Sequence, residues 1–151
     1  MWRLSYLLVL LAPVWGLVVV MIGVETAVSG GIFVDSGQLL GSSPSYDVAL
    51  GDLDGDANLD AFVANYGSGG KANTVWLNDG SGTFTDSGQQ LGSSDSYHVA
   101  LGDVDNDGDL DAFVGNFGPN RVWLNQGGTI GAFSESGQNL GTRISGGVGG
   151  G

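Results

Sequence analysis

From residue 31 onward the chain alternates short apolar runs with turn residues, and it shows no helical periodicity. The runs VALG, DAFVAN, TVWLN and TFTDSG are rich in Val, Phe, Trp and Thr and are bounded by Gly, Asn and Asp. AFVA and VWL are continuously apolar, which predicts strands that are covered on both faces. The pattern therefore predicts four short strands at 48–51, 60–65, 74–78 and 83–88, with a hairpin turn at 78–82.

This strand pattern recurs along the chain. Residues 33–67 align without a gap on residues 84–118, an offset of 51, and a third copy begins at 133–141 with an offset of 49. The repeats differ in length only after Gly118 and in the following turn, so the shared blocks are the structural elements. Four strands in a repeat of about 50 residues are typical of a β-propeller, in which blades pack radially. The fold class that we expect is therefore all-β, built from β-propeller blades with four-stranded antiparallel sheets.

The repeats also predict how the chain is divided. We expect the repeat region to span residues 31–141. It would contain the outer strand of an incomplete blade at 33–45 and full blades at 46–92 and 97–141. Two blades and one strand make only a partial propeller, because a closed ring needs at least about four blades. We expect Phe33 to Gln38 to be a closing strand and the chain to be the N-terminal piece of a longer protein, with assembly of several chains as the alternative. Residues 142–151 form a Gly-rich tail.

A separate hydrophobic segment precedes the repeats. Leu4 to Val24 follows Arg3 and carries no charge over 21 residues, long enough for a helix that enters a membrane. A cleaved signal peptide would use Ala27 and Ser29 as the small residues before the cut, whereas an uncleaved anchor would keep Arg3 in the cytoplasm. A buried helix of a soluble core is the remaining alternative. We therefore expect residues 1–30 to be a signal peptide or membrane anchor, preceding an extracellular, secreted or cell-surface module. The chain would contact the membrane only through this segment, if it is uncleaved.

Composition adds a strong negative charge. The 151 residues include 16 acidic and 4 basic side chains, one histidine and no cysteine, for a net charge of −12. Phosphate binding needs clustered Lys or Arg, so nucleic acid is not an expected partner. Without cysteine, disulfides do not stabilise the exported part.

Nine of the sixteen carboxylates fall in two windows, DLDGDANLD (52–60) and DVDNDGDLD (103–111), each between a VALG and an AFV run. A tight loop with Asp at positions 1, 3, 5 and 9 and a backbone carbonyl at position 7 can wrap Ca²⁺, which takes about six to eight oxygen ligands. Gly or Asn at positions 4 and 6 allows positive φ, so that the carboxylates converge. The apolar residue at position 8, Leu59 or Leu110, is placed to pin the loop to the core.

Other interpretations of these windows fit less well. An EF-hand needs a bidentate Glu at position 12 and flanking helices, but this position is Val63 or Val114 and both flanks are predicted strands. Magnesium prefers octahedral sites with several waters. An acidic surface turn without metal would leave closely spaced carboxylates uncompensated, which destabilises a fold.

The pattern resembles the FG-GAP or VCBS repeat family, the calcium-binding propeller blades also found in the head of integrin α chains. The resemblance covers residues 33–141, in DLDGDANLD, DVDNDGDLD, NTVWLNDGSGTF, RVWLNQGG and NFGP. It implies a propeller with Ca²⁺ in the loop that joins the first two strands of a blade, and an extracellular role in adhesion or ligand binding. The implied ligands are Asp52, Asp54, Asp56, Asn58 through its carbonyl and Asp60, and then Asp103, Asp105, Asp107, Asp109 through its carbonyl and Asp111.

The two loops differ at position 6, which is Ala57 in the first and Gly108 in the second. If this position is left-handed, alanine costs about 1–2 kcal/mol, a factor of roughly 5–30 in affinity. We therefore expect two Ca²⁺ sites, with the 103–111 site the tighter.

Catalytic chemistry is not expected. His98 is the only histidine and aligns with Asp47 of the first repeat, which favours a solvated strand-edge residue over a general base. The serines lie in turns without a partner to activate them. Trp76 and Trp123 recur at one repeat position, which favours blade packing over sugar stacking.

Together these features predict a calcium-binding, non-catalytic extracellular propeller module. Its loops would be presented to an extracellular protein or glycan whose identity the sequence does not give. The alternatives are an accessory module of a secreted enzyme whose catalytic part lies beyond residue 151, and a structural spacer of a surface protein.

Overall fold

The computed structural model describes residues 4–6, 22–24 and 34–141, and the chain divides into two compact units, 1–36 and 37–151. In the first unit, β1 (Leu4–Tyr6) and β2 (Ile22–Val24) pair as a two-stranded antiparallel sheet. The middle of the predicted hydrophobic helix, residues 7–21, lies outside the described residues, so that helix stays a prediction. The Gly-rich tail, 142–151, also lies outside them. Within the described ranges, no helix has the length and apolarity needed to cross a membrane.

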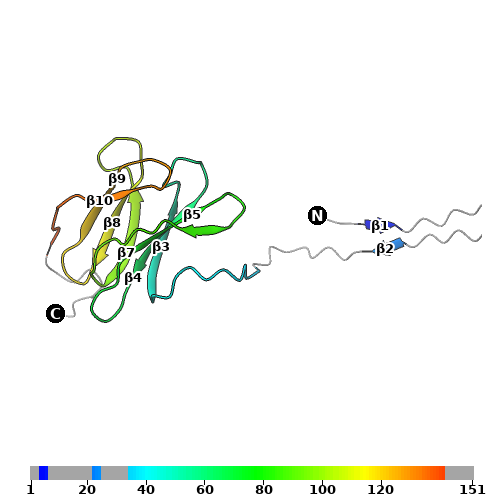
Figure 1. Ribbon diagram of the computed structural model, residues 1–151, viewed down its shortest axis with the longest axis horizontal. Coiled ribbons are helices and arrows are strands. Elements are labelled where there is room, and N and C mark those ends of the chain that lie inside the picture. The colour runs from blue at the N-terminus through cyan, green and yellow to red at the C-terminus, as the bar shows by residue number, and fades with distance from the viewer. Residues whose placement is uncertain (1–3, 7–21, 25–33, 142–151) are drawn as a thin grey trace, which may run out of the picture. The chain divides into compact units, whose positions relative to one another are not determined.

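The second unit contains two four-stranded antiparallel sheets in which consecutive strands pair (Figure 1). The first sheet consists of β3 (Ser45–Gly51), β4 (Asp60–Asn65), β5 (Thr74–Asn78) and β6 (Phe84–Asp86). The second sheet consists of β7 (Ser96–Gly102), β8 (Asp111–Asn116), β9 (Arg121–Asn125) and β10 (Phe133–Glu135). The all-β prediction and the four strands per repeat are confirmed for the described part of the chain.

The first strand of each sheet is longer than the VALG run that predicted it. Pairing between β3 and β4 continues through an irregularity to Ser45, and the hydroxyl of Ser45 lies 3.0 Å from Oδ1 of Asn65. In the second sheet the Ser96 hydroxyl donates to Oδ1 of Asn116 at 2.8 Å. Each hydroxyl bonds the far end of the neighbouring strand, so these polar residues extend the sheet beyond its apolar run.

The main hydrophobic core lies where the two sheets pack together, with β3 beside β7 (Figure 1). Its buried members are Leu53, Phe62, Val75, Leu91, Ala112, Val114 and Trp123. Every residue of β4 is buried, as predicted for its apolar run AFVA, and the polar residues at its two ends, Asp60 and Asn65, are buried as well. A smaller cluster on the other face of the first sheet contains Ala61, Val63 and Trp76, with Phe84 packed against it.

A recurring glutamine fastens the start of each sheet's last strand. Nε2 of Gln89 donates to the carbonyl of Gly131 at 3.0 Å, and its Oε1 accepts from the amide of Phe133 at 2.8 Å. Gln38 forms the same pair of bonds with the carbonyl of Gly82, at 2.7 Å, and the amide of Phe84, at 2.8 Å. We call each arrangement a glutamine clasp, because one side-chain amide holds both sides of a hairpin end.

The clasp of Gln38 stands where the sequence predicted an outer strand at 33–45. Phe33 lies outside the described residues, and the structure places no strand from Val34 to Pro44. An outer strand needs the third strand of its own blade as a hydrogen-bonding partner, and the described residues contain no such strand for this segment.

Aromatic side chains link the sheets at one end. The rings of Tyr46 and Tyr97 lie 4.8 Å apart across the two sheets, and Tyr66 contacts both at 5.4 and 5.6 Å. These separations are within the range of favourable aromatic pairs.

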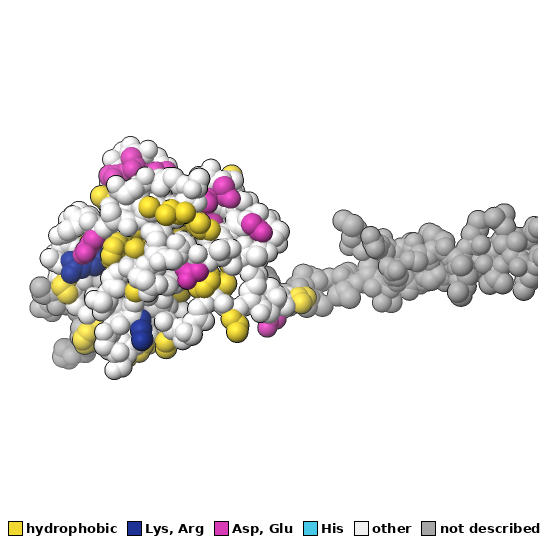
Figure 2. All heavy atoms as spheres, viewed as in Figure 1, with side chains coloured by type: hydrophobic (Ala, Val, Ile, Leu, Met, Phe, Trp, Pro, Cys, Tyr) yellow, Lys and Arg dark blue, Asp and Glu magenta, His cyan; other side chains and the backbone are white. Residues whose placement is uncertain are grey.

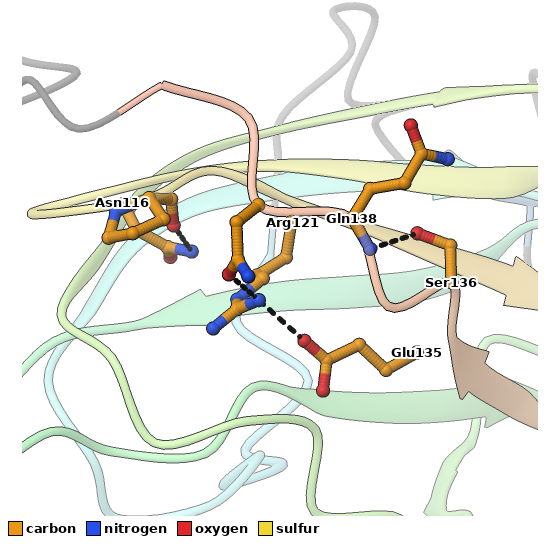
Figure 3. Close-up of polar contacts among 7 residues, drawn as sticks. Asn116, Arg121, Glu135, Ser136 and Gln138 are labelled. Carbon is orange, nitrogen blue, oxygen red and sulfur yellow. Dashed lines mark hydrogen bonds and ion pairs between the residues drawn. The ribbon is translucent and has the colours of Figure 1, made fainter.

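The two repeated tryptophans are buried, as expected for packing residues, but their polar atoms differ. Nε1 of Trp76 donates to the Thr74 hydroxyl at 3.1 Å. In the second sheet Arg121 takes the place of that threonine and pairs with Glu135 at 3.0 Å (Figure 3). The buried Nε1 of Trp123 consequently has no hydrogen-bond partner.

Candidate metal centre

The two acidic windows form equivalent loops, each joining the first and second strands of a sheet. Residues 52–60 connect β3 to β4, and residues 103–111 connect β7 to β8. Figure 2 shows acidic side chains gathered along the upper rim of the described unit.

The position 1 carboxylate organises the first loop. Oδ1 of Asp52 accepts from the amides of Gly55 at 2.8 Å and Asp56 at 3.1 Å, and its Oδ2 accepts from the amide of Ala57 at 3.0 Å. The carboxylate therefore holds the loop in a tight turn around itself.

Asp103 has the same role in the second loop. Its Oδ1 accepts from the amide of Asn106 at 2.7 Å, and its Oδ2 accepts from the amide of Gly108 at 3.2 Å. Both loops form these hydrogen bonds to the position 1 carboxylate although their other residues differ. The shared spacing of the aspartates therefore explains the pattern.

Positions 4 and 6 are left-handed in both loops, as the sequence predicted. φ is 82° at Gly55 and 70° at Ala57, and it is 64° at Asn106 and 99° at Gly108. Asn and Gly adopt this region readily, whereas alanine is strained there. Ala57 therefore has the left-handed conformation on which its predicted cost depended.

Three carboxylates converge in each loop. They are Asp52, Asp54 and Asp56 in the first loop and Asp103, Asp105 and Asp111 in the second, each set offering oxygens within 4.8 Å of one another. Of the other predicted ligands, Asp60 and Asp107 lie outside these groups. The side chains of Asn58 and Asp109 lie against the following hairpin turns, where a Cβ on Gly80 or Gly127 would come within 2.7 Å of them.

The position 9 carboxylates have a structural role that sequence reasoning missed. Asp60 is fully buried, and its two oxygens accept from the amides of Leu53 and Asn78, both at 2.8 Å. Asp111 bonds the amides of Val104 and Asn125 in the same way, at 2.8 Å each. The sequence contained one signal of this role. An aspartate directly precedes each apolar AFV run, where a buried charge without hydrogen-bond partners would be costly.

Leu59 and Leu110 were both predicted to pin their loops, and for Leu59 this is wrong. Leu110 packs against the main core, but Leu59 is 56% exposed. The first loop is instead held by Leu53, which is 1% exposed, whereas its counterpart Val104 is 54% exposed. The difference arises because the two sheets meet on the Leu53 side of the first loop and on the Leu110 side of the second.

Desolvation and, after it, neighbouring like charges raise the pKa values of the position 3 carboxyls. Burial raises the pKa of Asp54, and the charges of Asp60, Asp56 and Asp52 raise it further against an opposing backbone hydrogen bond. Burial also raises the pKa of Asp105, with added repulsion from Asp107 and Asp111. Both loops therefore hold negative charge that a cation would stabilise.

The donor set fits a hard divalent cation. The converging side chains offer only carboxylate oxygens, the ligands that Ca²⁺ and Mg²⁺ prefer over nitrogen or sulfur. Two oxygens bound to one Ca²⁺ are at most about 5 Å apart, given bond lengths of about 2.3–2.6 Å. The 4.8 Å spread of each group is within that limit.

Other potentially reactive groups are placed as expected. His98 is exposed, with 70% of its side chain accessible, and its Nδ1 lies 3.6 Å from the Asp47 carboxylate of the other sheet. A solvated strand residue was predicted at this position.

Comparison with known proteins gives one family. The model of the FG-GAP-like repeat matches residues 52–114, from the first acidic loop to the middle of β8. No curated protein and no solved structure matches the chain. The match includes both acidic loops and the segment NTVWLNDGSGTF, whereas NFGP and RVWLNQGG, which also carried the resemblance, lie outside it. Residues 52–114 of this chain are therefore similar to the FG-GAP-like repeat.

Proposed function

We propose that the second unit is a calcium-binding β-propeller repeat module that acts in adhesion or ligand binding outside the cell, without catalysis. The observation that carries the proposal is the convergence of three carboxylates in each of two equivalent loops, on turns with left-handed residues at positions 4 and 6. Such convergence is unfavourable for free carboxylates and favourable around a cation.

Each loop would supply its odd-numbered positions to the ion. In the first loop these are Asp52, Asp54, Asp56, the carbonyl of Asn58 and Asp60; in the second, Asp103, Asp105, Asp107, the carbonyl of Asp109 and Asp111. When bound, Ca²⁺ would neutralise the like charges and fix the loop. Because Asp60 also bonds the end of β5 through Asn78, the ion would tie the loop to the third strand of its sheet.

The extracellular role is supported by the hydrophobic segment of residues 4–24 and by the type of site. Calcium modules outside the cell work with dissociation constants of about 10⁻⁴–10⁻³ M, which a partly exposed carboxylate loop can provide. The proposal of a non-catalytic role is supported by the exposed position of His98 among the described residues.

The test is thermal melting of the full chain with Ca²⁺, with Mg²⁺ and with a chelator, together with calorimetric titration. We expect two bound Ca²⁺ and a higher melting temperature, with about 2.7 kcal/mol of stabilisation for each site at a hundredfold excess over its dissociation constant. The double variant Asp54→Asn, Asp105→Asn should lose this response. Asp86→Asn, at an exposed carboxylate outside both loops, is the matched control and should keep it. No shift at millimolar Ca²⁺ would overturn the proposal.

A further inference from the structure

Two exposed faces of the second unit correspond, position by position, to the two halves of its buried internal interface. In that interface the first sheet contributes Gly51, Leu53 and Phe62, and the second sheet contributes Val99, Leu101 and Leu110. At the repeat offset of 51, the first set recurs as Gly102, Val104 and Phe113, which we call the Phe113 face. The second set is preceded by Val48, Leu50 and Leu59, which we call the Leu50 face.

The Phe113 face is exposed, whereas the equivalent residues of the first sheet are buried. Phe62 is 0% exposed and Leu53 is 1% exposed, whereas Phe113 is 39% and Val104 is 54% exposed. These side chains follow the same strand register as their counterparts, since Phe113 pairs with Ala100 as Phe62 pairs with Ala49. The difference in exposure therefore arises because no sheet of the described residues packs on the Phe113 face, and not because its side chains point in another direction.

The Leu50 face shows the same relation. Val99, Leu101 and Leu110 pack against the main core. Their counterparts Val48, Leu50 and Leu59 are 54%, 56% and 56% exposed. Apolar side chains uncovered together on a sheet face mark an interaction surface.

A pair of glycines shows how closely such faces approach. A Cβ on Gly51 would lie 2.7 Å from Cδ1 of Leu110 and 3.0 Å from Cδ1 of Leu101, so a side chain at this position would force the two leucines to shift. A Cβ on Gly102 would have no atom within 4 Å. Gly102 thus occupies the position of a close contact with its leucine partners absent.

We propose that a second copy of this chain docks head-to-tail, with its Leu50 face on the Phe113 face of the first copy. The internal interface shows that a Val-Leu-Leu surface fits a Gly-aliphatic-Phe surface in this repeat, and the second copy presents the required surface. The contact is heterologous, so the docked pair keeps one free Leu50 face on the first copy and one free Phe113 face on the second, and further copies can add. It goes beyond the proposed function, because neither face includes a proposed calcium ligand.

In the docked pair, two glutamines would compete for the same hairpin end. Gln38 and Gln89 each hold a hairpin end, and Gln138 is the third member of the series. Gln138 is exposed, and its side-chain amide points away from Arg121 and Glu135 in Figure 3. In the docked pair it reaches the hairpin end that Gln38 holds in the second copy. Gln38→Ala should therefore strengthen association, and Gln138→Ala should weaken it.

The main test is sedimentation velocity of the full chain in detergent over a range of concentrations. We expect concentration-dependent association that Gly102→Val weakens at least tenfold while the melting temperature is unchanged, because the position is open and its φ is ordinary. Gly51→Val is the matched control, since it disrupts the internal interface and should lower the melting temperature. A monomer at all concentrations, or association that is insensitive to Gly102→Val, would overturn the proposal.

Cross-linking identifies the pairing of faces independently of the N-terminal segment. The chain has no cysteine, so chains carrying Gly102→Cys or Leu59→Cys can be oxidised separately and as a mixture. We expect disulfide-linked dimers mainly in the mixture, as the heterologous contact requires. Dimers that form equally well from either variant alone would show a different contact and overturn the arrangement.

Discussion

Position 6 of the acidic loops shows how one side chain can distinguish two otherwise equivalent sites. Ala57 and Gly108 both have positive φ, 70° and 99°, and both donate their amides to the position 1 carboxylate. The left-handed turn was predictable from the Gly and Asn content of the loops. The burial of Asp60 was not, because it depends on hydrogen bonds to residues 7 and 18 positions away.

Replacing Ala57 by glycine should stabilise the first loop. The change relieves about 1–2 kcal/mol of left-handed strain, less about 0.5–1 kcal/mol for the greater freedom of glycine in the unfolded chain. We expect a gain of up to about 1 kcal/mol in the free energy of unfolding and tighter Ca²⁺ binding at this loop, measured by denaturant melts and calorimetry. Asn106→Gly is the control and should gain less, since Asn adopts this region readily. Two equal sites before the change would contradict this explanation.

Removing the Asp60 side chain should destabilise the fold whether or not Ca²⁺ is present. Asp60→Ala leaves the amides of Leu53 and Asn78 without their acceptor, at about 1–3 kcal/mol for each buried donor. Asp54→Ala is the matched variant, because Oδ1 of Asp54 accepts only one exposed bond, from Asp56 at 3.2 Å. Urea melts in chelator should show a loss for Asp60→Ala and little or none for Asp54→Ala. Equal losses would contradict the structural role of Asp60.

At the scale of elements, local sequence predicted the strands inside each repeat, but the outer strand expected at 33–45 is not found from Val34 to Pro44, and long-range contacts were not predictable. The apolar runs predicted β4 and β5 with their observed bounds, because strand formation there depends on neighbouring residues. Leu59 and Leu110 have the same local sequence position, yet only the packing of the two sheets decides which one is covered. The SGQ sequence recurs three times, and repetition alone did not indicate that its glutamine reaches a hairpin more than 40 residues away.

The clasp of Gln89 should contribute measurably to the joining of the two sheets. Gln89→Ala removes its bonds to Gly131 and Phe133 and should lower the free energy of unfolding by about 1–3 kcal/mol. Gln138→Ala removes an exposed side chain and serves as the control, with an expected change close to zero at concentrations where the chain is monomeric. Denaturant melts compare the two. The idea fails if both substitutions have the same effect.

At the scale of the whole molecule, charge opposes the compact state. The net charge is −12, and nine of the acidic side chains lie in two short loops. The raised pKa values of Asp54 and Asp105 mean that the folded state binds these protons more tightly than the unfolded chain does. The cost of desolvating these carboxylates and of holding them beside like charges is therefore present at neutral pH, and it fades as pH falls through the pKa values of the folded state.

Salt should consequently stabilise the chain in the presence of chelator. The screening length falls to about 10 Å at 0.1 M salt, which weakens repulsion within and between the loops. We expect the melting temperature to rise with NaCl, and CaCl₂ at equal ionic strength to raise it more by direct binding. Identical curves for the two salts would show that screening alone accounts for the effect and would contradict specific binding.

The unequal tryptophans provide each sheet with its own spectroscopic reporter. Trp76 donates its indole proton to Thr74, whereas the indole proton of Trp123 has no acceptor. The two protons should therefore give separate resonances in a nitrogen-15 NMR spectrum, without any label added to the chain beyond the isotope. Since local opening need not involve both sheets at once, following these two signals through a denaturant titration would show which sheet separates first.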